Sequence, residues 1–307
     1  MNRISVSLFG SRFAFGLSMI AATVVFCAVL ATIAFSSSSE AQTGNGDFLA
    51  KEGTPPPGAN VPCRPTAKHP YPVILVHGTF ETMDQNWSVL SPRLKEKGYC
   101  VFALNYGNRG IEDIRDSARE LGTFVDNVKR YTGAKKVSLV GHSQGGMMPR
   151  RWIKSQRAGN EVDDLIGLAP SNYGTELQQV STSDATAEDF GLPATSLSNP
   201  CRACEQQAAG SKFLKRLNRG DDTLGSASYT QIATNDDEII IPFTRCFLKG
   251  KKRTKNLILQ DYYPADVPIT HQNIYDDPVA QAFVFDALAN PGTTKPKRAL
   301  RDFPISP

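Results

Sequence analysis

The sequence predicts an α/β fold, with a mostly parallel central sheet covered by helices on both faces. Short, continuous apolar runs are typical of strands buried on both sides of a sheet. These runs alternate along the chain with segments whose apolar residues recur every three or four positions, the spacing of one helix face. Such alternation indicates a parallel sheet rather than a bundle or a sandwich.

Each predicted element follows from its own pattern. The predicted strands are 72–77, 99–104, 136–141, 162–168, 229–234 and 256–260, and the predicted helices are 87–97, 111–131, 144–156 and 278–289. In the helix over 111–131 the apolar stripe is Ile114, Ala118, Leu121, Val125 and Val128. Gly133 is expected to end that helix, because glycine adopts the left-handed cap conformation without steric cost.

The chain divides into four segments. Residues 71–290 are expected to form one α/β domain, interrupted at 171–222 by an insertion with no predicted strand. We expect the insertion over the carboxyl edge of the sheet, where loops line the binding crevice. Residues 42–70 are rich in proline and predict an extended lead-in on the surface, and 291–307 predict a solvated tail.

Residues 1–41 have the pattern of an export signal. Arg3 and Arg12 precede an uncharged apolar run over 13–35, and small residues follow near Ala41. The sequence therefore predicts a secreted protein. The run is also long enough to cross a bilayer, so an uncleaved membrane anchor is the alternative.

The composition is that of a globular protein. The chain has 307 residues, of which 40% are hydrophobic and 21% are charged, and this excludes collagen-like, coiled-coil and wholly disordered chains. The net charge of +4 is too small for a protein whose main task is to neutralise phosphates. We expect no nucleic-acid partner.

Six cysteines agree with an oxidising compartment. Cys27 lies in the export segment, and the others are Cys63, Cys100, Cys201, Cys204 and Cys246. Because five is an odd number, at least one thiol is expected to be unpaired or intermolecular. The preferred bridge joins Cys63 to Cys100 and ties the lead-in to a core strand. The pair Cys201-Arg-Ala-Cys204 lacks a companion CxxC or His pair, so we expect no metal site.

The clearest chemical pattern is Gly141-His142-Ser143-Gln144-Gly145. It follows a predicted strand and opens a predicted helix, which is the context of a nucleophile elbow. Ser143 is therefore the candidate nucleophile. The backbone N–H of Gln144, at the start of the helix, is a candidate donor to a developing oxyanion.

A serine nucleophile needs a base and an acid, which follow it in the chain in this architecture. The chain has only four histidines, and His271 alone lies after Ser143, so it is the candidate base. The acid is expected after the strand over 229–234. The candidates there are Asp236, Asp237 and Glu238, with Asp261 after the next strand as an outside candidate. Position alone does not choose among them.

The second oxyanion donor is expected in the loop after the first strand, His77-Gly78-Thr79-Phe80. The N–H of Thr79 is the candidate, with its hydroxyl as a further donor. His77 precedes Ser143 and is expected to shape the turn.

Several motifs together resemble the secreted bacterial class 2 lipases and esterases of the α/β-hydrolase superfamily, and also the fungal lipase B type. They are His77-Gly78-Thr79-Phe80, Gly141 to Gly146, Cys201-Arg-Ala-Cys204-Glu-Gln-Gln207, Gly210 to Leu214 with Leu217-Asn218, and Tyr229 to Pro242. The resemblance covers about 70–289 and implies an α/β-hydrolase fold. It also implies Asp237 as the acid and Thr79 and Gln144 as the oxyanion donors.

One departure affects the disulfides that this resemblance implies. Family members usually have a cysteine where this chain has Tyr262-Tyr263, as a partner for the Cys201 region. Cys246 is the substitute that this sequence offers, which leaves the second bridge open.

The resulting hypothesis is a secreted serine ester hydrolase, either a triacylglycerol lipase or a carboxylesterase, acting on acylglycerols or other acyl esters without a cofactor. The alternatives are an acyltransferase or polyester hydrolase with the same triad, and a non-catalytic binding protein on a hydrolase scaffold. We expect a monomer with contact to lipid interfaces. The basic run over 249–255 is interpreted as a solvated turn, with an anionic surface as the alternative partner, and 193–197 as a segment that shapes the acyl pocket.

Overall fold

The structure is a computed structural model that describes residue 49 and residues 52–176, 201–250, 253–262 and 268–304. All of these residues belong to one compact unit, residues 45–307. The export segment 1–41, Cys27 within it and the predicted pocket segment 193–197 lie outside the described residues.

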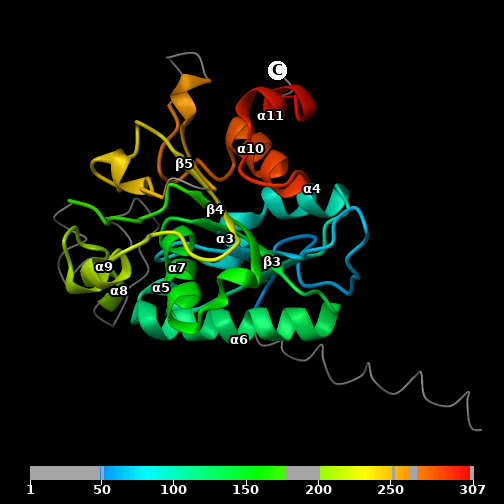
Figure 1. The fold of residues 1–307 in the computed structure, drawn as a ribbon, viewed down its shortest axis with the longest axis horizontal. Coiled ribbons are helices and arrows are strands. Elements are labelled where there is room, and N and C mark those ends of the chain that lie inside the picture. Colours follow the sequence, from blue (N-terminus) through cyan, green and yellow to red (C-terminus); the bar gives the residue numbers. More distant parts are fainter. Residues whose placement is uncertain (1–48, 50–51, 177–200, 251–252, 263–267, 305–307) are drawn as a thin grey trace, which may run out of the picture. The chain divides into compact units, whose positions relative to one another are not determined.

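Six parallel strands form one sheet in the order β2-β1-β3-β4-β5-β6 (Figure 1). The strands are β1 (Val73–Val76), β2 (Val101–Leu104), β3 (Val137–His142), β4 (Val162–Leu168), β5 (Ser228–Ala233) and β6 (Thr254–Ile258). Every predicted strand is present, with ends that differ by at most two residues. The predicted α/β class with a parallel sheet is confirmed.

The strand order places a topological switch point between β1 and β3. From β1 the chain moves to β2 on one side, and from β3 it proceeds to β4, β5 and β6 on the other side. The loops that leave β1 and β3 at their carboxyl ends, after Val76 and after His142, therefore diverge, and ligands of open α/β sheets bind at such a point.

Helices cover both faces of the sheet. The described helices are α3 (Met83–Trp87), α4 (Leu90–Glu96), α5 (Gly107–Gly110), α6 (Ile114–Thr132), α7 (Gln144–Gln156), α8 (Arg202–Gln207), α9 (Lys212–Leu217), α10 (Pro278–Ala289) and α11 (Pro296–Asp302), with 3-10 turns η1 (Ala158–Asn160), η4 (Phe243–Cys246) and η5 (Leu259–Asp261). Figure 1 shows α6 on one side of the sheet and α10 and α11 on the other.

Alternate residues of each central strand supply two separate cores. Ile74 and Val76 of β1 pack with residues of α6 and α7, whereas Val73 and Leu75 pack with residues of α3, α4 and α10. All four side chains are fully buried. This two-sided burial explains why the strand is a continuous apolar run rather than an alternating one.

The helix predictions are accurate where caps and periodicity agree. Helices α7 and α10 have the predicted bounds, and α6 ends at Gly133, whose φ is 74°. Helix α6 begins at Ile114 and not at the predicted residue 111, because the side chain of Asp113 caps it by accepting the N–H of Arg115.

The helix predicted over 87–97 is present as α4, but it begins at Leu90 and not at residue 87. Trp87 belongs to a separate short helix, α3, which begins after Thr82 because the hydroxyl of Thr82 accepts the N–H of Gln85. Trp87 ends α3 and Leu90 begins α4, and both side chains are buried. The two short helices thus share one apolar face without forming one continuous helix.

The segments at both ends of the domain pack more closely than the sequence predicts. The described lead-in, 52–70, has no helix or strand, but Asn60 forms three hydrogen bonds with the backbone of β2. The solvated tail predicted at 291–307 is wrong for its central part, which contains α11. Ala299 of α11 is buried, and Arg298 pairs with Asp286 of α10.

The cysteines form two bridges among the described residues. Cys63 pairs with Cys100, as predicted, with a Cα–Cα distance of 5.7 Å. Cys201 pairs with Cys204, with a Cα–Cα distance of 5.2 Å. Cys246 is free and buried, so the suggestion that it bridges to the Cys201 region is wrong. Cys201 and Cys204 therefore form a local bridge across three positions of sequence, and neither is available to Cys246.

The predicted insertion contributes α8 and α9 in its described part, 171–176 and 201–222. Both helices are short, and a parallel bridge between Thr175 and Ala208 ties them to the segment after β4. None of the described helices is long and apolar enough to cross a membrane.

Candidate active site

Ser143 lies on a sharp turn between β3 and α7. Its φ of 51° and ψ of −121° are outside the regions that L residues favour. The turn requires its flanking glycines: a Cβ on Gly141 would lie 2.0 Å from the carbonyl oxygen of Gly145, and one on Gly145 would lie 2.1 Å from that of Val76. Glycines at both positions therefore allow the strained turn of a nucleophile elbow, on which Ser143 is 6% exposed.

His271 and Asp237 meet at the same edge of the sheet, although they follow different strands. Asp237 comes after β5 and His271 after β6. Nδ1 of His271 lies 3.0 Å from a carboxylate oxygen of Asp237, and both side chains are almost completely buried. Oδ1 of Asp237 also accepts the backbone N–H groups of Ile239 and Ile240, at 3.0 Å and 2.7 Å. These bonds fix the carboxylate in front of the imidazole.

The carboxylates around His271 favour its charged form. Burial lowers the pKa of the imidazole, but the charge and hydrogen bond of Asp237, with Glu81 and Glu238, outweigh it and raise the pKa above its ordinary value. Because the carboxylate of Asp237 accepts a hydrogen bond from Nδ1–H, the lone pair of the neutral imidazole is on Nε2. The ring is thus prepared to accept a proton at Nε2.

His142, the residue before Ser143, contacts the candidate base, His271, directly. The ring centroids of His142 and His271 are 4.8 Å apart, and Nε2–H of His142 donates to the backbone carbonyl of His271 at 2.9 Å. Nδ1 of His142 lies 2.9 Å from Oε2 of Glu81, which also accepts the N–H of Gly78. The base loop is therefore anchored to the residue next to the candidate nucleophile.

The Glu81–His142 pair was not predicted from the sequence. Burial favours a neutral carboxyl, but the charge and hydrogen bond of His142 outweigh it and lower the pKa of Glu81. Both ring nitrogens of His142 face acceptor oxygens, Oε2 of Glu81 and the backbone carbonyl of His271, at 2.9 Å each. No short motif marks such a pair, because 61 positions separate its members.

Thr79 and Gln144, the two predicted oxyanion donors, are in contact. Nε2 of Gln144 donates to the hydroxyl oxygen of Thr79 at 2.7 Å and to the carbonyl of Gly110 at 2.6 Å. Nε2 of Gln207 on α8 donates to the same hydroxyl oxygen at 2.9 Å. The loop after β1 is thus joined both to the start of α7 and to the insertion.

The residues described above all lie within the part of the chain that matches a known family. The family profile described as Lipase (class 2) matches residues 70–283, which is more than half of the chain. The chain belongs to the class 2 lipase family. The resemblance seen in the sequence motifs is therefore confirmed.

Curated relatives of this class 2 lipase family member match over a shorter stretch. A triacylglycerol lipase from Pseudarthrobacter phenanthrenivorans is 36% identical over 86 residues, which is 26% of this chain and 27% of that protein. A triacylglycerol lipase from Burkholderia plantarii is also 36% identical over 86 residues, which is 26% of this chain and 24% of that protein. The chain spans about a quarter of the length of these relatives.

Among solved structures, Aspergillus fumigatus lipase B is similar with a TM-score of 0.64 and 22% sequence identity. The similarity covers 76% of this chain and 57% of that chain. It shows the α/β-hydrolase fold that the class 2 lipase resemblance implies.

In this class 2 lipase family member two of the other candidate acids have hydrogen-bond partners other than the imidazole of His271. Glu238 accepts the backbone N–H of His271 at 2.9 Å, and Asp236 accepts the side-chain amide of Gln260 at 3.1 Å. Both residues are exposed, as is Asp261. Two of the three therefore brace the loop around the base rather than contact the base itself.

Two further sequence motifs concern metal binding and His77. The described residues contain no group of three or more His, Cys, Asp or Glu side chains that could hold a metal ion. His77 is fully buried, and its Nδ1 hydrogen-bonds with the backbone of Gly78 at 2.7 Å. Burial is the largest effect that lowers the pKa of His77 to about 4, so it stays neutral in the turn that it shapes.

Proposed function

We propose that this class 2 lipase family member is a serine ester hydrolase that cleaves acylglycerols or related acyl esters through an acyl-enzyme on Ser143. The observation that carries the proposal is the position of His271: its Nδ1 is held by Asp237 at 3.0 Å, and its ring lies against His142, the neighbour of Ser143. This position leaves Nε2 for the serine proton.

In the first half-reaction, Oγ of Ser143 bonds to the ester carbonyl carbon and its proton moves to Nε2 of His271. The N–H of Gln144 and the N–H and hydroxyl of Thr79 stabilise the resulting oxyanion. The intermediate then collapses, the carbon–oxygen bond to the alcohol breaks, and the alcohol leaves with the proton from Nε2. Asp237 stabilises the imidazolium during the transfer.

In the second half-reaction, water attacks the acyl carbon and gives one proton to Nε2 of His271. The bond to Oγ of Ser143 breaks, the serine recovers its proton, and the carboxylic acid is released. Both half-reactions balance with ester and water alone.

The decisive experiment compares Ser143→Ala with Ser155→Ala, which removes a hydroxyl from the exposed face of the same helix. With p-nitrophenyl butyrate, Ser143→Ala should lower kcat by up to about 10⁶-fold, and Ser155→Ala should behave as wild type. Full activity of Ser143→Ala would refute the proposal. Covalent labelling of Ser143 by a fluorophosphonate separates an enzyme from a non-catalytic binding protein on the same scaffold.

The substrate class is proposed from the family and from relatives named triacylglycerol lipase. A series of esters of increasing acyl length, assayed below and above micelle formation, separates a lipase from a soluble carboxylesterase. Product analysis with added alcohol or polyester separates hydrolysis from acyl transfer and from polymer cleavage.

We further propose that the protein is exported and monomeric. The two disulfides among the described residues support an oxidising compartment. N-terminal sequencing of the extracellular protein should give a chain that starts near residue 42, whereas recovery of the intact chain in the membrane fraction would indicate an anchor. Light scattering should give the mass of one chain.

A further inference from the structure

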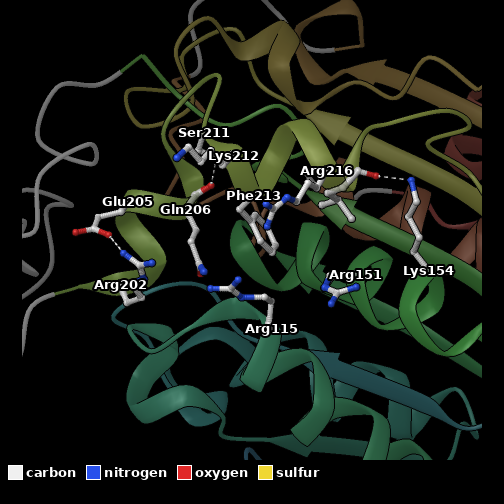
Figure 2. A pocket seen from close by; sticks show the side chains of 11 residues that line it. Arg115, Arg151, Lys154, Arg202, Glu205, Gln206, Ser211, Lys212, Phe213 and Arg216 are labelled. Atoms are coloured by element: carbon white, nitrogen blue, oxygen red, sulfur yellow. Dashed lines mark hydrogen bonds and ion pairs between the residues drawn. The ribbon is translucent and has the colours of Figure 1, made fainter.

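A groove whose lining includes none of Ser143, Asp237 and His271 is lined mainly by positive side chains (Figure 2). It has a volume of about 670 Å³, within the range of small-molecule sites. Its lining comes from four helices: Arg115 of α6; Arg151 and Lys154 of α7; Arg202, Glu205 and Gln206 of α8; and Lys212, Phe213, Arg216 and Leu217 of α9, with Ser211 before α9. We call this the cationic groove.

The charge of the cationic groove is out of proportion to the rest of the chain. Its lining holds six basic side chains against one acidic side chain, a net charge of +5, whereas the whole chain carries +4. Lys212 and Arg216 lie four positions apart on α9, and Arg151 and Lys154 lie three apart on α7. Like charges at these spacings destabilise a helix slightly, so an anion between them would relieve repulsion within the protein.

Four of these six cations form no ion pair with a carboxylate among the described residues. Arg115 pairs with Asp113, and Arg202 pairs with Glu205. Lys154 donates to two backbone carbonyls, including that of Leu217 at 2.9 Å. The remaining three, Arg151, Lys212 and Arg216, form no ion pair within the part of the chain that the structure describes.

The shape and chemistry of the groove select the kind of anion. Guanidinium groups present planar pairs of N–H donors that match phosphate oxygens, and several cations together favour a group with more than one negative charge. Phe213 is half-buried and Leu217 is buried beside them, so the groove also offers apolar surface. A phosphate joined to an organic group would contact both: its phosphate the guanidinium groups, and its organic part the apolar surface.

We propose that the cationic groove binds the phosphate group of a phosphate ester, with Arg151 and Arg216 as its main ligands. The phosphate is held by the guanidinium groups, and the organic part lies over Phe213. Two sources supply this chemistry: a soluble phosphate ester, or the headgroup of an anionic phospholipid.

The groove also adjoins the elements that hold the oxyanion loop. Gln206 lines it and accepts the N–H of Ile114 at the start of α6, while the next residue, Gln207, donates to Thr79. A phosphate bound between Arg151 and Arg216 would therefore link α7 to α9, close to the helix that contacts Thr79.

The test measures binding of the full chain and does not use ester hydrolysis, so it is independent of the proposed enzyme activity. Flotation with vesicles of phosphatidylcholine containing phosphatidylglycerol probes the lipid headgroup, and calorimetric titration with glycerol 3-phosphate probes the soluble ester. Phosphatidylcholine vesicles alone are the control. Binding to the phosphatidylglycerol vesicles alone identifies a headgroup, and binding to glycerol 3-phosphate identifies a soluble ligand.

Arg151→Gln/Arg216→Gln should weaken binding of whichever probe binds the wild-type chain more than tenfold. Each basic residue removed from a lipid-contacting site lowers the affinity about fivefold. Arg151→Lys/Arg216→Lys should retain most of the binding. Lys249→Gln/Lys255→Gln removes two charges from the basic run over 249–255 and should bind as wild type. Far-UV circular dichroism of each variant verifies the fold.

Two outcomes overturn the proposal. One is the absence of binding of the wild-type chain to either probe at 50 mM salt, roughly the low-salt condition at which phosphate contacts are strongest. The other is equal weakening by the groove variant and by Lys249→Gln/Lys255→Gln, which would show attraction to net charge rather than a site.

Discussion

The side-chain amide of Gln207 donates to the hydroxyl oxygen of Thr79 at 2.9 Å, across 128 positions of sequence. Because the amide of Gln144 donates to the same oxygen, both lone pairs of the hydroxyl are engaged. The hydroxyl proton is then left for a third partner. The hydroxyl of Thr79 is therefore oriented by two residues that are distant in sequence, Gln144 of α7 and Gln207 of the insertion.

The first prediction concerns this hydroxyl. Thr79→Val keeps the backbone N–H and the side-chain volume but removes the O–H. In the proposed mechanism kcat for p-nitrophenyl butyrate should fall by about 10²- to 10³-fold, with little change in KM, because the bond strengthens only as the oxyanion forms. Thr79→Ser retains the hydroxyl and should keep most of the activity. Equal activity of both variants would remove the hydroxyl from the oxyanion hole.

The site illustrates what order along the chain can and cannot predict. Ser143 follows from a motif between a strand and a helix, and His271 follows because no other histidine comes after it. Asp237 did not follow from the residues alone, because its neighbours are also acids. The structure distinguishes the three acids by their burial and contacts. Asp237 is buried and contacts the imidazole of His271, whereas Asp236 and Glu238 are exposed.

The features that the sequence did not predict depend on contacts between distant segments. Glu81 meets His142 only because β1 and β3 are neighbours in the sheet. Helix α11 is held by the buried Ala299 and by Arg298 on Asp286, in a segment whose basic composition predicts solvent exposure. Composition describes a segment by itself, and tertiary packing overrides it.

The second prediction concerns pH. Burial opposes the imidazolium of His271, but nearby carboxylates raise its pKa, and proton transfer from serine requires the neutral ring. The acidic limb of kcat/KM should therefore lie above the ordinary histidine value of about 6.5. Glu238→Gln removes one negative charge near the ring, destabilises the imidazolium and lowers its pKa. The limb should move to lower pH.

The matched control is Asp261→Asn, which removes an exposed carboxylate that is not among the causes of the His271 shift. Its limb should coincide with that of the wild type. A limb that moves to higher pH in Glu238→Gln, or that moves equally in both variants, would contradict the electrostatic explanation.

The third prediction concerns the buried pair of Glu81 and His142, whose side chains are 2% and 1% exposed. Glu81→Gln keeps an oxygen for the N–H of Gly78 but removes the charge opposite His142. Breaking a buried pair from one side leaves the other group uncompensated, so the free energy of unfolding should fall by about 3–5 kcal/mol. Urea denaturation measures this loss.

A double-mutant cycle tests whether that loss belongs to the pair. The variant Glu81→Gln/His142→Gln should lose less stability than the sum of the two single variants, because neither buried group is then left without its original partner. Strict additivity would show that the two residues do not interact energetically.

The fourth prediction concerns the disulfides and the free thiol. Cys63 and Cys100 are 37 positions apart, whereas Cys201 and Cys204 are three apart. Loop-closure entropy then gives a stabilisation of roughly 4 kcal/mol for the first bridge and roughly 2 kcal/mol for the second, as upper bounds. Replacing both cysteines of a bridge by serine should therefore destabilise the chain more for Cys63 and Cys100, as measured by urea denaturation.

Cys246 provides the chemical check on this pairing. The thiol is fully buried, and burial raises its pKa well above the ordinary value, so it should not react with a thiol reagent in the folded protein. In the mature chain without Cys27, one thiol should react after unfolding in denaturant without reductant. The variant Cys246→Ala should show none. Three reactive thiols in the wild type would mean that one of the two bridges is not formed. Rapid reaction in the folded state would mean that the thiol of Cys246, at the end of η4, is exposed rather than buried.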